Sequence, residues 1–362
     1  MGYHLGWGGA EGAGAGRRAR TRLPPLHRRE PRATLRAVDS LRQVASVSLP
    51  AAVVVCECFA RDGLQNQDAF VATELKVRFV DAATEAGLPK IEVASYAHPK
   101  YLPQFRDSEE VLRRISRRAG VQYLGLVPNE RGLDRCLEHH DKGFGPDTVE
   151  TILSASEPHN QANVKRTVAE SQAEIAAICR RARPAGLRLI GGIATAFGCP
   201  IQGDVPVDAV LALARWYADL GVEAILFGDT TGMANPLQVE GLFASVRQAV
   251  PGVEPIAHFH DTRGTALANA VAALRAGVTH FDGSTGGVGG RPKFTEGSYP
   301  AIMGFTGNAC TEDLVAMLDA MGVRTGISLE RLVALGQLAE EILGRQLQSH
   351  VVRTGLARRR AS

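Results

Sequence analysis

The pattern of hydrophobic and polar residues along the chain changes at residue 51. From there on, short apolar runs rich in β-branched residues alternate with longer segments whose apolar positions recur at helical spacing. The runs predict eight strands, at residues 51–56, 90–94, 121–127, 148–154, 187–195, 223–227, 255–260 and 278–282. The segments between them predict helices, including residues 74–86, 164–181, 207–220, 237–250 and 265–276. Several helices end at a glycine suited to the position after the last turn, namely Gly87, Gly221 and Gly277.

The regular alternation of strand and helix predicts the fold. Strands that are apolar along most of their length and separated by helices are typical of a parallel sheet covered by helices. Eight units favour a closed (β/α)8 TIM barrel, and a doubly wound open sheet is the weaker choice because no G-x-G-x-x-G motif follows the first strand. We expect the barrel over residues 47–309 and additional C-terminal helices, packed on the barrel or on a partner subunit, over 310–352.

The two ends of the chain differ from the barrel region. Residues 1–46 are rich in Gly, Ala, Arg and Pro without apolar periodicity, which predicts a disordered extension. An Arg-rich, acid-poor leader is also typical of an organelle transit peptide, but residues 2–23 are too rich in glycine for a good amphipathic helix. We therefore favour a dispensable extension. Residues 353–362 predict a solvated basic tail.

Charge and composition narrow the function classes. The net charge of +3 comes from the ends, because 28 basic and 35 acidic residues lie between residues 46 and 353. This acidic middle does not support a nucleic-acid partner. No apolar run approaches the roughly 20 residues that span a bilayer, so no membrane segment is expected. The six scattered cysteines predict reduced thiols in a cytoplasmic compartment, or in the mitochondrial matrix if the leader is a transit peptide.

Polar residues gather at the predicted carboxyl ends of all eight strands, where the active sites of such barrels lie. They are Glu57, Arg61 and Asp62; Glu92 and Ser95; Asn129; Ser154, Ser156 and Glu157; Thr195; Asp229 and Thr230; His258 and His260; Asp282 and Ser284. Such a concentration of charged and hydrogen-bonding groups at one rim predicts an active site.

The segment Ala257-His258-Phe259-His260-Asp261 carries the clearest candidate chemistry. In an extended strand His258 and His260 share one face, so both imidazoles can bind one metal ion. An isolated His-x-His pair is more often two ordinary histidines. With a carboxylate such as Asp62, however, the pair makes a partial octahedral shell for Mg, Mn, Fe or Zn, with open positions for substrate oxygens.

Three further features admit two interpretations each. Arg61 either forms a common loop ion pair with Asp62 or stabilises an oxyanion that develops during carbon–carbon bond cleavage. The glycines from Gly286 to Gly290 predict a flexible functional loop or a close backbone approach to an anionic ligand. Asn308 either caps the helix that begins at Thr311 or supplies an amide oxygen to the metal.

A set of motifs in chain order carries a resemblance to a known family. The motifs are Arg61-Asp62-Gly63-Leu64-Gln65-Asn66, Glu92 with Ser95 and Pro99-Lys100, Gly198-Cys199-Pro200, Gly228-Asp229-Thr230 with Gly232, His258-Phe259-His260-Asp261-Thr262, Gly289-Gly290, and Gly307-Asn308 with Thr311-Glu312-Asp313-Leu314. Together, from about residue 51 to 350, they resemble the hydroxymethylglutaryl-CoA lyases, which belong to a superfamily of metal-dependent lyases built on TIM barrels.

The resemblance implies a role for each matching residue. A divalent cation, Mg or Mn before Zn or Fe, would be bound by Asp62, His258, His260 and Asn308. The enolate oxygen of a thioester would be steadied by Arg61. Groups around the substrate would be positioned or polarised by Glu92, Asp229 and Thr230, and the substrate would be bound by Gln65, Ser95 and Arg291. The implied reaction is a retro-Claisen cleavage of a hydroxymethylglutaryl-CoA-like thioester to a keto acid and an acyl-CoA enolate, which is then protonated.

Two departures from the family pattern modify this expectation. Arg291 stands where the family's lyases carry a cysteine credited with proton transfer, and the interval from Arg291 to Asn308 is longer than the family's. We therefore expect the proton from Glu296, Tyr299 or water. After the fourth strand the basic residues that precede the family's asparagine are replaced by Gln161 and Ala162. Groups that compensate at the CoA phosphates would be Lys165, Arg166, Arg291 and Lys293.

Two other functions remain open on the sequence alone. A related aldolase or condensing enzyme would act on a free hydroxy or keto acid, with Arg291 and Lys293 binding its carboxylate. A barrel that has lost catalysis would bind metal and ligand without turning substrate over. In each case we expect a homodimer or a higher homo-oligomer.

Overall fold

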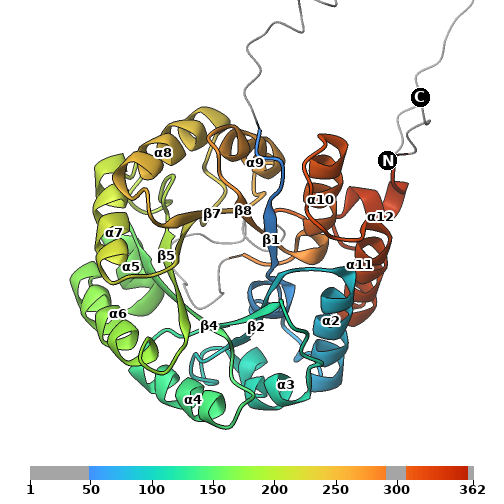
Figure 1. Ribbon diagram of the computed structural model, residues 1–362, viewed down its shortest axis with the longest axis horizontal. Helices are drawn as coiled ribbons and strands as arrows, with labels where there is room; N and C mark the ends of the chain where they lie inside the picture. The colour runs from blue at the N-terminus through green and yellow to red at the C-terminus, as the bar shows by residue number, and fades with distance from the viewer. Residues whose placement is uncertain (1–48, 291–306, 358–362) are drawn as a thin grey trace, which may run out of the picture. The chain divides into compact units, whose positions relative to one another are not determined.

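The computed structural model describes residues 49–290 and 307–357, and within these ranges eight parallel strands form one closed barrel in the order β1 to β8 (Figure 1). The strands are β1 (Val54–Glu57), β2 (Lys90–Ser95), β3 (Gln122–Leu126), β4 (Thr148–Ser154), β5 (Arg188–Ala194), β6 (Ala224–Asp229), β7 (Glu254–Phe259) and β8 (His280–Gly283). β1 pairs with β8 to close the barrel, with Val54 opposite His280. The predicted (β/α)8 TIM barrel is confirmed, and the open sheet is wrong. The predicted extension over residues 1–46 lies outside the described residues.

Helices surround the barrel as a ring (Figure 1). They are α2 (Thr73–Ala86), α3 (Ser108–Arg114), α4 (Glu130–Asp141), α5 (Glu157–Val164), α6 (Val168–Ala182), α7 (Val207–Asp219), α8 (Pro236–Ala249) and α9 (Ala266–Arg275). The helix predicted to begin at residue 164 begins at Val168 instead. Lys165 adopts a left-handed conformation with φ 58° and ends α5, and Thr167 then caps α6 in a capping box with Glu170. The glycines predicted to follow α2, α7 and α9 all have positive φ, as expected.

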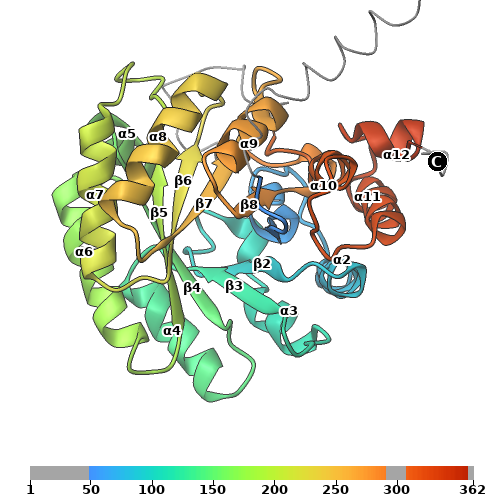
Figure 2. The ribbon, with the colours of Figure 1, turned by 45° about the horizontal axis from the view of Figure 1, so that its top comes forward.

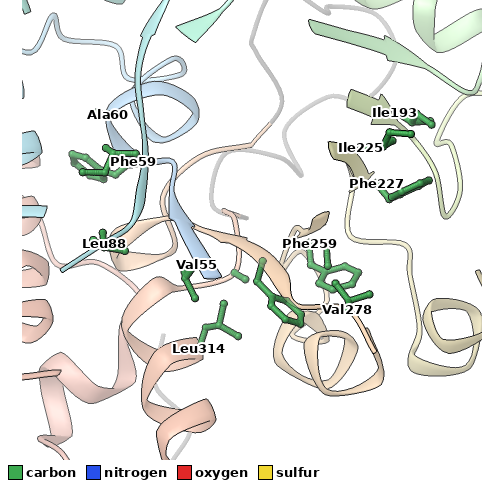
Figure 3. Packing of buried hydrophobic residues seen from close by; sticks show 14 of the residues in the cluster. Val55, Phe59, Ala60, Leu88, Ile193, Ile225, Phe227, Phe259, Val278 and Leu314 are labelled. Atoms are coloured by element: carbon green, nitrogen blue, oxygen red, sulfur yellow. The ribbon is translucent and has the colours of Figure 1, made fainter. Parts of the chain in front are cut away.

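The core consists of two apolar layers, because alternate residues of a strand face opposite sides of the sheet. One layer lies between the strands and the helices and contains residues such as Val55, Phe227 and Phe259 (Figure 3). The other is a smaller cluster on the alternate positions that includes Cys56, Cys58, Leu124, Ile190, Ala224, Leu226 and Ile256. This inner cluster supports the polar site from below.

Three helices follow the barrel in the described part of the chain, α10 (Thr311–Ala320), α11 (Leu329–Leu343) and α12 (His350–Thr354) (Figure 2). α11 packs against α2, and α10 contacts β1 and β8. The Asp313 carboxylate accepts hydrogen bonds from the backbone of His350 and Val351, each 2.9 Å, and so fixes α12 to α10. The predicted C-terminal helices are therefore confirmed. Every helix among the residues described is too short or too polar to cross a membrane.

Candidate active site

A single π-helical turn, η1 (Phe59–Gly63), follows β1 and carries two buried charged residues. Arg61 Nε and Nη2 donate to the two carboxylate oxygens of Glu92 at 2.6 and 2.9 Å. Arg61 Nη1 also lies 3.3 Å from Asp62 Oδ1. The bidentate bond fixes the plane of the guanidinium at the end of β1.

The two histidines of the predicted metal pair face each other at the end of β7. The Nε2 atoms of His258 and His260 are 3.1 Å apart, and Asp62 Oδ2 lies 3.8 Å from His260 Nε2. His258 Nδ1 bonds Asp282 Oδ2 at 2.9 Å, which turns its Nε2 toward the site. Asp62, His258 and His260 thus bring three ligand atoms together, as the resemblance implied.

The charges of these groups depend on one another. Burial alone would raise the pKa of Asp62, but Arg61 and the two imidazoles lower it below its ordinary value. Burial and the neighbouring His258 lower the pKa of His260 to about 4. Burial opposes charge on His258 as well, but the bond to Asp282 raises its pKa overall. Near neutral pH the site therefore contains a carboxylate and at least one neutral imidazole, which are the forms that bind metal ions.

Asn308 reaches the site through a short extended segment that lies beside the ends of β7 and β8. His260 and Asn308 form an antiparallel bridge, with Asp261 N donating to Gly307 O at 2.9 Å. On the other side Ser284 N donates to Ala309 O at 2.9 Å. This segment places Asn308 against Asp62, with Nδ2 2.6 Å from Oδ2.

Asn308 does not cap the helix that follows it. The residue at the N-terminus of α10 is Cys310, and no side-chain cap bond is present there among the described residues. Asn308 Oδ1 is buried and has no hydrogen-bond partner in the described part of the chain. An unpaired buried amide oxygen beside two facing imidazole nitrogens and a carboxylate fits a divalent cation, because these are the oxygen and nitrogen donors that such ions prefer.

The glycines after β8 allow this close packing. Gly289 has φ 134°, and a Cβ added there would lie 2.2 Å from Asn308 Nδ2 and 3.1 Å from Asp62 Oδ2. The next carbonyl, that of Gly290, accepts hydrogen bonds from Gln65 Nε2 at 3.1 Å and from Asn66 Nδ2 at 2.6 Å. The backbone of this glycine run therefore lies close to Asn308 and Asp62. Its approach to an anionic ligand stays a prediction.

A cavity of about 560 Å³ opens above the cluster. Its wall contains Arg61, Asp62, His258 and His260 together with two predicted substrate-site residues, Gln65 and Thr230. Gln65 Nε2 also donates to Asp62 Oδ1. The Thr230 hydroxyl accepts a hydrogen bond from Thr195 N at 2.8 Å. Among the other residues that line it are His98, Tyr101, Lys165 and Arg166.

Three predicted site residues, Glu92, Ser95 and Asp229, are not among the described residues that line the cavity. Glu92 holds Arg61. Ser95 Oγ accepts a bond from Ala97 N at 3.2 Å. The Asp229 carboxylate accepts bonds from the backbone of Met233 and Ala234, and burial raises its pKa to about 6. The predicted binding residues Arg291 and Lys293, and the predicted proton donors Glu296 and Tyr299, lie outside the described residues.

The side chains of several other polar residues at the rim form hydrogen bonds with backbone groups. Glu57 accepts bonds from Phe59 N and from the amide and hydroxyl of Thr285, at 2.8 to 2.9 Å, and burial raises its pKa to about 7. Asn129 caps α4 and Ser156 caps α5. A strand-end position therefore does not by itself indicate a role in binding.

One acidic residue of the cavity wall was missed by the sequence reasoning. Glu150 lies within β4, is 2% exposed, and has its Oε1 3.8 Å from Arg61 Nη2. The available signal was a carboxylate at an inward position of an apolar strand, two and four residues before Ile152 and Ser154 on the same face. Glu150 lies in the middle of its strand, whereas the predicted site residues lie at strand ends.

Comparison with known proteins agrees with this geometry. The HMGL-like family model matches residues 52–339. Hydroxymethylglutaryl-CoA lyase YngG of Bacillus subtilis is 40% identical over 83% of this chain and 96% of that protein. The mitochondrial hydroxymethylglutaryl-CoA lyase of Mus musculus is 35% identical over 87% and 94%. An (R)-citramalyl-CoA lyase of Chloroflexus aurantiacus is 34% identical over 84% and 95%.

Solved structures give the same result. The HMG-CoA lyase of Bacillus subtilis superposes with a TM-score of 0.77 at 39% identity, covering 84% of this chain and 98% of that one. An HMG-CoA lyase from Acinetobacter baumannii, solved with coenzyme A and 3-methylmalate, has the same TM-score at 36% identity, covering 84% and 95%. On these matches, which extend over most of both chains, the protein belongs to the HMGL-like family.

Proposed function

We propose that this protein is a divalent-metal-dependent lyase that cleaves the carbon–carbon bond of a 3-hydroxy-3-methylglutaryl-CoA-like thioester. The products are an acyl-CoA, acetyl-CoA for the parent substrate, and a keto acid, acetoacetate. The observation that carries the proposal is the convergence of His258, His260, Asp62 and the unpaired Asn308 Oδ1 beneath a cavity whose wall includes Arg61.

The four donors suit Mg or Mn best, because two of them are oxygens and neither thiolate nor thioether is present among them. When bound, the cation supplies a Lewis acid for the hydroxyl and acyl oxygens of the substrate. Asp282 holds the His258 ring in the orientation that this binding needs.

Arg61 stabilises the negative charge that develops on the thioester oxygen. Both fork bonds of its guanidinium are taken by Glu92, so the group is rigid before substrate enters, and it lines the cavity. A preorganised donor aimed at the thioester oxygen stabilises the enolate without reorganisation, and one such donor typically contributes about 10²- to 10³-fold to kcat.

Basic side chains favour a CoA thioester over a free acid. Lys165 and Arg166 line the cavity together with Tyr101, and both side chains can approach phosphate groups. They compensate for Gln161 and Ala162, which stand where the family has basic residues. The relatives named above act, by their names, on CoA thioesters, either hydroxymethylglutaryl-CoA or citramalyl-CoA. We propose hydroxymethylglutaryl-CoA as the substrate, acted on by a homodimer or higher homo-oligomer in the cytoplasm.

A turnover assay tests the proposal. Purified protein with Mn²⁺ or Mg²⁺ is offered hydroxymethylglutaryl-CoA, citramalyl-CoA and the free acid 3-hydroxy-3-methylglutarate, and keto acid release is followed. We expect release from hydroxymethylglutaryl-CoA that is lost in Asp62→Ala and His258→Ala. The matched control is His280→Ala, since His280 lies at the start of β8 and pairs with Glu254 at 2.9 Å. Turnover of the free acid alone, or full activity of Asp62→Ala, contradicts the proposal.

A further inference from the structure

Glu150 is a buried acid whose side chain lines the reaction cavity. Its strand positions pair it with Leu126 of β3 and Ile190 of β5, in the interior of the barrel. Oε1 has no hydrogen-bond partner among the described residues, although the residue lines the same cavity as Arg61 and both histidines. A buried, ionised carboxylate with an unpaired oxygen costs free energy, whereas a protonated carboxyl group can donate a hydrogen bond to a ligand.

The neighbours of Glu150 favour its neutral form. Arg61 directs both fork bonds to Glu92 and comes no nearer to Glu150 than 3.8 Å. Burial, the negative charge of Glu92 and a hydrogen bond with Glu92 raise the pKa of Glu150 well above its ordinary value, Asp282 raises it further, and Arg61 only partly opposes this. Tyr217, the remaining titratable group near it, is itself buried with a raised pKa and stays neutral. The surroundings of Glu150 therefore favour its protonated form.

The proposed reaction needs a proton at this place. Cleavage leaves a thioester enolate whose carbon must be protonated, and the guanidinium of Arg291 does not release protons in proteins. None of the six cysteines lines the described part of the cavity wall. If Arg61 holds the enolate oxygen, the carbon to be protonated is two bonds away from that oxygen. Glu150 Oε1, 3.8 Å from the same guanidinium, is then within reach of that carbon.

We propose that Glu150 is the catalytic acid that protonates the acyl-CoA enolate, an inference that rests on the proposed lyase function. The O–H bond of the substrate hydroxyl breaks, its proton passes to water in the cavity, and the carbon–carbon bond breaks with its electron pair moving into the enolate. The O–H bond of Glu150 then breaks as a new C–H bond forms at the enolate carbon. Glu150 is left as a carboxylate and takes a proton back from water, so a turnover neither consumes nor releases a proton.

The test uses the full chain loaded with Mn²⁺ and the variant Glu150→Gln, which keeps the shape of the acid but has no transferable proton. The matched control is Thr148→Val, because Thr148 precedes Glu150 on the same face of β4 and its buried hydroxyl also has no partner among the described residues. Four quantities are measured: kcat and KM for the thioester, Mn²⁺ affinity, and the exchange of acetyl-CoA methyl hydrogens in D2O in the presence of the keto acid.

For Glu150→Gln we expect kcat and methyl exchange to fall together by about 10²- to 10⁴-fold, with KM and Mn²⁺ affinity nearly unchanged. Thr148→Val should match the wild type in all four. A variant that keeps kcat and exchange within threefold of the wild type overturns the inference while leaving the lyase function in place. A raised KM with unchanged kcat and exchange overturns it too, because Glu150 would then only bind substrate. A wild type that cleaves no thioester refutes both.

Discussion

The substitution Gly289→Ala tests whether the geometry of the proposed metal donors depends on the absence of a side chain at residue 289. Gly289 lies against Asn308 and Asp62, and its φ of 134° is unfavourable for any residue with a Cβ. The change therefore has two effects, a conformational cost at residue 289 itself and a displacement of the donors. The two effects can be separated with a second glycine.

The conformational part is modest. A residue with a Cβ at positive φ costs roughly 1–2 kcal/mol. The added Cβ would also lie 2.2 Å from Asn308 Nδ2, where ordinary contact begins at 3.4 Å, so the amide must move by roughly 1 Å. That movement breaks the 2.6 Å bond to Asp62. A donor set displaced by about 1 Å is expected to lower kcat/KM on the order of 10²-fold, equivalent to about 2.7 kcal/mol.

The matched control is Gly120→Ala. Gly120 has φ 86° and no atom within 4 Å of an added Cβ, and it precedes β3 at the other end of the barrel. Both variants should lose similar stability in urea unfolding, but only Gly289→Ala should lose Mn²⁺ affinity, measured by titration calorimetry, and turnover. If Gly289→Ala binds Mn²⁺ as tightly as Gly120→Ala, the close approach of this backbone does not set the donor geometry and the reasoning is wrong.

Three further predictions concern the surroundings of the donors. Asp282→Asn should weaken Mn²⁺ binding by about 10- to 100-fold in calorimetry, because His258 loses the carboxylate that orients it; unchanged affinity would contradict this. Mn²⁺ at one hundred times its Kd should stabilise the fold by about 2.7 kcal/mol against a chelator-treated sample in urea unfolding. Burial raises the pKa of Glu312 to about 7 from 4.5, so its contribution to stability is fully present below pH 4.5 and is lost as pH rises to 7. Glu312→Gln should therefore gain up to about 3 kcal/mol relative to the wild type between pH 5 and 8, and a difference independent of pH would refute this.

The fold was predictable because it follows from local periodicity. Apolar strands and amphipathic helices repeat eight times, and each pattern spans enough residues to be recognised without tertiary information. The late start of α6 was not predictable, since the apolar spacing continues through residues 164–168. Only the left-handed conformation of Lys165 and the capping box at Thr167 divide that stretch into α5 and α6.

The site was predictable in position but not in the role of each side chain. The carboxyl ends of the strands carry Arg61, Asp62, His258 and His260, and the barrel brings all four to one cavity. Sequence position does not show how a side chain is satisfied, so the hydrogen bonds from the backbone of Met233 and Ala234 to the Asp229 carboxylate could not be predicted.

Two other residues mark the limits of the sequence reasoning. Asn308 lies 48 positions after His260 in the chain, and only the bridge between them shows that it lies beside the histidines. Glu150 lies inside a strand, and a carboxylate there cannot be recognised as part of a site until its neighbours in the barrel are known.

The segment that contains Asn308 is fixed to the barrel at both of its edges. The interval between Gly290 and Gly307 has both borders fastened to the barrel, one through Gln65 and Asn66 and the other through Asp261. The bonds from Asp261 N to Gly307 O and from Ser284 N to Ala309 O join backbone atoms. The position of Asn308 therefore depends little on which side chains flank it.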